Sequence, residues 1–78
     1  MTITTAAALL AQEFIDAVTS HEVTQHTLAT GKQMQARGEP MRPGSLEGAE
    51  ADAAAARAEL IAARDALRRA LDALDASL

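Results

Sequence analysis

Hydrophobic positions in the second half of the chain recur at alternating spacings of three and four residues. The row runs through Leu46, Ala49, Ala53, Ala56, Leu60, Ala63, Leu67, Ala70 and Leu74. This is the a and d pattern of a heptad repeat, which is typical of one helix packing lengthwise against another. We therefore predict a helix over about residues 46–77, and we call its row of a and d positions a seam.

The first half of the chain carries a second seam with a different composition. It consists of Ile3, Ala7, Leu10, Phe14, Ala17, His21, Thr24, Leu28, Gly31 and Gln35. The first five of these positions are apolar and the seam then turns polar, with Leu28 as an exception. The threonines between residues 19 and 30 lower the helix propensity. We predict a helix over about residues 5–37, which Gly31 either interrupts or leaves continuous.

A short connector separates the two predicted helices. Pro40 and Pro43 push the residues before them out of the helical region. Gly38 suits the position that follows a helix C-terminus, and Ser45 is the predicted N-cap of the second helix. A turn over residues 38–45 favours antiparallel neighbours. The sequence thus predicts an all-α fold, in which residues 1–78 form one antiparallel helical hairpin.

The composition indicates that this hairpin needs a partner. The chain has 78 residues, no cysteine and a single aromatic residue, Phe14. Chains of this length bury a small fraction of their surface, and alanine adds little apolar area. Ile61, Leu71 and Leu78 lie outside the seam, so two helices cannot cover both apolar stripes. We expect oligomerisation or a partner to complete the fold.

The apolar side chains concentrate at the end of the hairpin that holds the two termini. We predict that the core and the interface lie in Ile3, Leu10, Phe14, Ile15, Val18, Leu60, Ile61, Leu67, Leu71, Leu74 and Leu78.

Charge and hydropathy limit the partners. Eleven acidic and seven basic residues give a net charge of −4, which argues against binding to nucleic acid. No segment approaches the roughly 20 apolar residues that span a bilayer. Ala6–Ala11 is not preceded by a basic residue, so we expect no signal peptide. The expected location is the cytoplasm or an assembled particle.

The sequence gives little support to catalysis or metal binding. His21 and His26 flank Glu22 as in zinc proteases, but they are five residues apart rather than four and cannot bind one metal together. No serine lies in a glycine-flanked elbow, and no glycine-rich loop could hold a phosphate. We expect no catalytic residue, cofactor or metal, and therefore no enzyme.

Two further groups of residues leave alternatives open. Arg57, Arg64 and Arg68 lie on one side of the second helix and form either a docking patch for an acidic partner or a solvated face. Met34 and Met41 flank the turn, where they either contact a partner or fill a gap.

The order helix, Pro40-Met-Arg-Pro43 turn, helix resembles the subunits of type III secretion needles. That resemblance implies a hairpin that polymerises, although the chain ends in Asp-Ala-Ser-Leu rather than in the apolar and aromatic tail of needle subunits. The chain is also similar in size and shape to the small helical chaperones of such subunits. Helical accessory proteins of phage particles, rich in alanine and arginine, resemble it as well.

We therefore expect a non-catalytic structural or assembly subunit that acts by helix–helix association with itself or with other helical proteins. A structural or accessory protein of a phage particle is the first choice. The alternatives are a small chaperone or adaptor that masks a partner's hydrophobic helix, and an antitoxin-like regulator.

Overall fold

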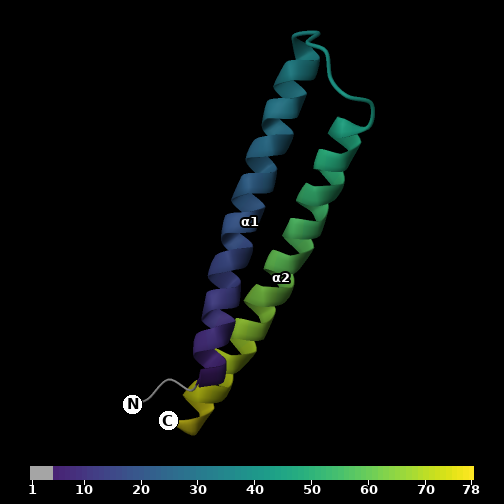
Figure 1. Ribbon diagram of the computed structural model, residues 1–78. Helices are drawn as coiled ribbons and strands as arrows, with labels where there is room; N and C mark the ends of the chain where they lie inside the picture. The colour runs from purple at the N-terminus through teal and green to yellow at the C-terminus, as the bar shows by residue number, and fades with distance from the viewer. Residues whose placement is uncertain (1–4) are drawn as a thin grey trace.

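The computed structural model describes residues 5–78, which form two long antiparallel helices (Figure 1). Helix α1 spans Thr5–Ala36 and helix α2 spans Ser45–Ser77. The predicted all-α hairpin is thus confirmed. The molecule measures 58 × 15 × 15 Å with a radius of gyration of 17.5 Å. A compact chain of this length would have a radius of gyration of about 11.5 Å, so the hairpin is a thin rod.

Helix α1 runs without interruption through Gly31, which answers the question that the sequence left open. Gly31 faces α2, where a Cβ atom added to it would lie 3.5 Å from Cδ1 of Leu46 and 3.7 Å from Cε of Met41. Two threonine hydroxyls bond to the backbone of the preceding turn: Thr24 Oγ1 donates to the carbonyl oxygens of Ser20 and His21, and Thr19 Oγ1 donates to that of Ile15. Their polar groups are therefore satisfied within the helix.

The end of α1 is a Schellman motif. The N–H of Gly38 donates to the Gln35 carbonyl at 3.0 Å, and the N–H of Glu39 donates to the Met34 carbonyl at 3.0 Å. Gly38 has a φ of +71°, the left-handed conformation that this motif requires and that glycine adopts without strain. The prediction that Gly38 ends the first helix is confirmed.

The start of α2 differs from the prediction. The N-cap is Gly44, with a φ of +79°, and it makes no side-chain cap hydrogen bond; its carbonyl accepts from the Gly48 N–H at 2.9 Å. Ser45 is the first helical residue, so the prediction that Ser45 caps the helix is wrong. The left-handed turn after Pro43 starts the helix one residue earlier. Glu47 lies in the first turn, where its carboxylate interacts favourably with the helix dipole.

The core of the hairpin consists of alanine. Within residues 5–78, the buried hydrophobic residues are Ala17, Ala53 and Ala56, which are 8%, 4% and 4% exposed. No large side chain in that part of the chain is fully buried. All nine positions of the α2 seam are buried or half-buried, as the heptad pattern predicts. In α1 the pattern fails only at the turn, where Gln35 is exposed and Met34 faces inward instead.

Candidate interaction surface

The residues predicted to form the core and the interface fall into two groups. One group lies half-buried between the helices: Leu10, Phe14, Val18, Leu60, Leu67 and Leu74. The other remains open to solvent: Ile15, Ile61, Leu71 and Leu78, with exposed fractions of 55%, 39%, 49% and 77%. Ile3 lies outside the described residues. The second group comprises side chains that the hairpin alone does not cover.

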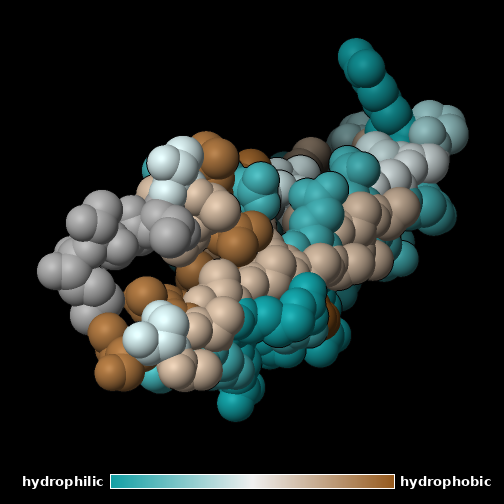
Figure 2. Space-filling model, turned by 90° about the horizontal axis from the view of Figure 1, so that it is seen from below, coloured by the Kyte–Doolittle hydropathy of each residue, from teal (hydrophilic) through white to brown (hydrophobic). Residues whose placement is uncertain are grey.

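An apolar groove runs between the helices at the terminal end. Its volume is about 380 Å³, and its lining consists chiefly of Ala8, Ala11, Ile15, Leu67, Leu71 and Leu74. Figure 2 looks at the molecule from this end and shows strongly hydrophobic residues gathered there among weakly hydrophobic ones, with hydrophilic residues farther along the rod. We call this depression the apolar groove. The side chains that line it are suited to contact with another apolar helix.

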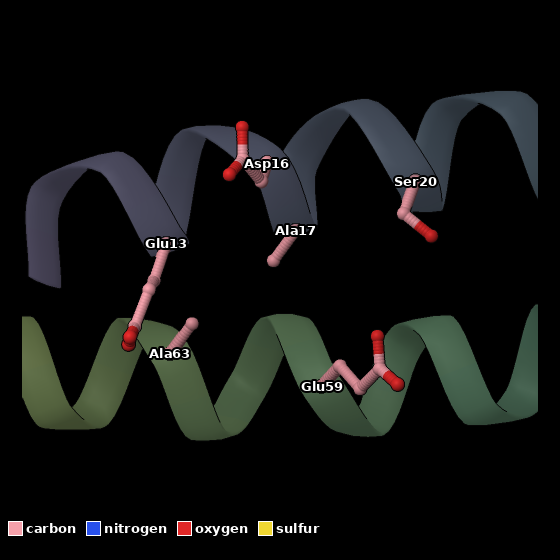
Figure 3. A pocket seen from close by; sticks show the side chains of 6 residues that line it. All are labelled: Glu13, Asp16, Ala17, Ser20, Glu59 and Ala63. Atoms are coloured by element: carbon pink, nitrogen blue, oxygen red, sulfur yellow. The ribbon is translucent and has the colours of Figure 1, made fainter. Parts of the chain in front are cut away.

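A second groove of about 410 Å³ is acidic. Glu13 and Asp16 of α1 and Glu59 of α2 line it, together with Ala17, Ser20 and Ala63. In Figure 3, Ala17 and Ala63 extend toward each other between the helices, while Glu13 reaches from α1 toward α2. We call this the acidic groove. No basic side chain of the described residues lines it. An apolar partner bound there would therefore remove water from carboxylates without replacing the lost hydrogen bonds, a cost in free energy that the apolar groove does not impose.

Sequence reasoning did not identify the acidic groove. The signal that could have identified it is the row of residues beside each seam, taken at a spacing of seven. In α1 this row is Ala6, Glu13 and Ser20, and in α2 it is Asp52, Glu59 and Ala66. Rows at such e and g positions flank a seam and set the choice of partner in coiled coils. The apolar groove lies on the opposite side of the two seams, where the flanking rows contain Ala11 in α1 and Leu71 in α2.

The three arginines on one side of α2 are exposed. Arg64 donates from Nε and Nη2 to Oδ1 of its neighbour Asp65, both at 3.1 Å. Across residues 5–78, the other ion pair joins Arg37 to Glu39 beside the turn, at 2.9 Å. Arg57 and Arg68 therefore have no acidic partner within the described hairpin. Their charges are available to a second molecule.

The remaining candidates take structural places. His21 is half-buried on the α1 seam and His26 is exposed. No group of three or more His, Asp or Glu side chains in the described residues could hold a metal ion. Met34 and Met41 both line a depression of about 360 Å³ over Gly31, so both side chains pack beneath the turn. Both methionines are half-buried, which, of the two alternatives, favours gap filling.

No protein-family model, curated protein or solved structure matches the chain. Neither of the two helices in the described part of the chain contains a stretch apolar enough to cross a membrane.

Proposed function

We propose that this chain is a non-catalytic subunit that acts by helix–helix association in a larger assembly. The observation that supports the proposal is the contrast between its core and its surface. The buried residues of the described hairpin are three alanines, whereas Ile15, Ile61 and Leu71 are exposed. Burying one methyl group contributes about 0.8 kcal/mol, and burying a leucine or isoleucine about 1.5–3 kcal/mol. Full use of the hydrophobic side chains at the terminal end therefore requires a second molecule.

The exposed area supports the same conclusion. The chain exposes 5807 Å². A compact monomer of 8.1 kDa would expose about 4500 Å², so the excess is about 1300 Å². A stable protein–protein interface removes about 800 Å² from each partner. The hairpin thus has enough surface for an interface of ordinary size.

Light scattering over a range of protein concentrations, with circular dichroism on the same samples, tests this function. We expect the purified chain to form an oligomer, and its helicity to fall on dilution as the oligomer dissociates. Leu71→Asp should weaken association, because a carboxylate would be buried without a partner. Leu9→Asp is a matched control on α1, since Leu9 is 60% exposed and does not line the apolar groove. A stable, fully helical monomer at all concentrations would contradict the proposal.

Within this class, a structural or accessory protein of a phage particle is our first proposal, and it rests on the helical composition rich in alanine and arginine. An adaptor that holds a client helix is the second, and the apolar groove is the feature that favours it. The two differ in stoichiometry. A particle component retains contacts between its own copies, whereas an adaptor exchanges them for a 1:1 complex with its client.

A further inference from the structure

The face that contains the apolar groove continues beyond it as a charged surface. On α1, the groove residue Ala8 begins a row with a spacing of seven that passes through Ile15 to Glu22. A parallel row leads from Ala11 through Val18 and Gln25 to Lys32. On α2, the groove residue Leu71 belongs to the row Leu71, Arg64, Arg57 and Glu50. We call the surface formed by these rows the groove face. Its terminal end is apolar, and its end near the turn carries charges of both signs.

The register of the hairpin places opposite charges on this face at similar heights. Gly31 and Ala49 line the same depression between the helices. Because the helices run in opposite directions, Lys32 lies one residue nearer the turn and Glu50 one residue farther from it, so the two differ in height by about 3 Å. Ala17 and Ala63 also face each other (Figure 3). Glu22, five residues after Ala17, is therefore nearly level with Arg57, six residues before Ala63. None of these four charged side chains forms an ion pair within the described residues.

A second copy with the same orientation would satisfy these groups. A two-fold axis parallel to the rod lays α1 of one copy on α2 of the other, without changing heights. Glu22 then faces Arg57 of the second copy, and Lys32 faces its Glu50. Toward the terminal end, Val18 lies nearly level with Ile61, which is on the row next to Leu71 and Arg64, and Ala8 lies nearly level with Leu71. Ile15 lies nearly level with Arg64, whose aliphatic stem offers it an apolar contact. The pairing is self-complementary, and the symmetry forms each contact twice.

Two other arrangements are less favourable. An antiparallel pair centred on Ile15 would lay α2 on α2 and bring Arg64 of one copy against Arg68 of the other, a repulsive contact. Stacking the groove face on the acidic groove of the next copy would place the apolar Ile15 against Glu13 and Asp16, which would lose water without gaining a hydrogen-bond donor.

We propose that the groove face binds the groove face of a second copy, with both turns at the same end, to form a parallel two-fold dimer that is a four-helix bundle. This inference rests on the proposed function and names the partner and the geometry of its first association step. The excess exposed area of the chain is sufficient for such an interface.

Charge reversal tests the pairing. Glu22→Arg and Arg57→Glu should each weaken dimerisation about tenfold, because each changes two symmetry-related attractive contacts into repulsive ones. The double variant E22R/R57E should restore the affinity of the wild type. Glu59→Arg is the matched control, because Glu59 is also on α2 but lines the acidic groove rather than the groove face. It should leave the dissociation constant unchanged. The dissociation constant is measured by sedimentation equilibrium. If the double variant dimerised no more tightly than the single variants, the proposed pairing would be overturned.

Cross-linking tests the orientation independently. The chain contains no cysteine, so Val18→Cys and Ile61→Cys each introduce a single thiol. The parallel dimer places position 18 of one copy near position 61 of the other. A short thiol-specific cross-linker should therefore join the two variants when they are mixed, and should not join either variant to itself. Self-linking of the separate variants, with no link in the mixture, would refute the parallel orientation.

The outcomes separate this inference from the proposed function. A self-associating wild type that resists charge reversal and does not cross-link overturns the groove-face dimer and leaves the assembly function standing. If the wild type is an unfolded monomer, a second copy is not its partner, and the proposal of association with a different protein is unaffected. A stable helical monomer overturns both.

Discussion

Replacing Gly31 with alanine should stabilise the protein. Gly31 lies within α1, and the glycines with positive φ in residues 5–78 are Gly38 and Gly44, so Gly31 has an ordinary helical backbone. A glycine inside a helix is less favourable than alanine by about 1 kcal/mol. The added methyl group would meet Leu46 at 3.5 Å and Met41 at 3.7 Å, which are ordinary van der Waals contacts with flexible side chains. It therefore fits without moving the helices.

The expected gain combines two contributions. The helix propensity supplies about 1 kcal/mol, and a half-buried methyl adds a few tenths, since complete burial contributes about 0.8 kcal/mol. For a chain of this size, 1 kcal/mol corresponds to a rise in Tm of about 4–8 °C. Thermal unfolding is followed by circular dichroism at one fixed protein concentration, because association makes Tm depend on concentration.

Gly48→Ala provides the matched control. Gly48 is also helical, but a Cβ atom there would have no neighbour within 4 Å. Its replacement should therefore give the gain in propensity without the packing contribution, and a smaller rise in Tm. If Gly31→Ala lowered Tm while Gly48→Ala raised it, the helices would have to approach more closely at Gly31 than the structure indicates, and the reasoning would be refuted.

Three other substitutions test separate parts of the fold. Gly38→Ala should destabilise the protein by about 1–2 kcal/mol in urea unfolding, because φ is +71° there; an unchanged midpoint would contradict the Schellman end of α1. Ala53→Leu should reduce Tm through overpacking that costs about 1–3 kcal/mol, whereas Ala54→Leu, on the exposed side, should change it little; equal effects would contradict the close approach of the helices. Arg37→Ala should change the unfolding free energy by less than about 0.5 kcal/mol, despite the ion pair with Glu39, because both side chains are exposed; a larger loss would show that the pair holds the turn.

The heptad spacing was sufficient to predict the hairpin and the inward face of both helices. Every seam position of α2 from Leu46 to Leu74 is at least half-buried, because side chains three and four residues apart necessarily share one helix face. Gly38 was also predictable, since few other residues adopt the left-handed conformation that ends a helix.

The helix cap and the inward residues near the turn could be identified only from the three-dimensional structure. Ser45 has the chemistry of an N-cap, yet the path of the chain after Pro43 gives that position to Gly44. Met34, rather than Gln35, is half-buried, and it lines the same depression as Met41 of the connector, an arrangement of two segments that no local pattern encodes. The acidic groove likewise joins Glu13 and Glu59, which are distant in sequence and become neighbours only in the antiparallel register.

The alanine core has a consequence for the heat capacity of unfolding. This quantity rises with the apolar area that unfolding exposes, and a typical 78-residue protein has a value of about 1 kcal/mol/K. Three buried alanines account for little of that area, so the isolated hairpin should have a lower value and a flatter dependence of stability on temperature. Calorimetry of the assembled protein should then return a larger value per chain. The difference measures the apolar area that association hides from water.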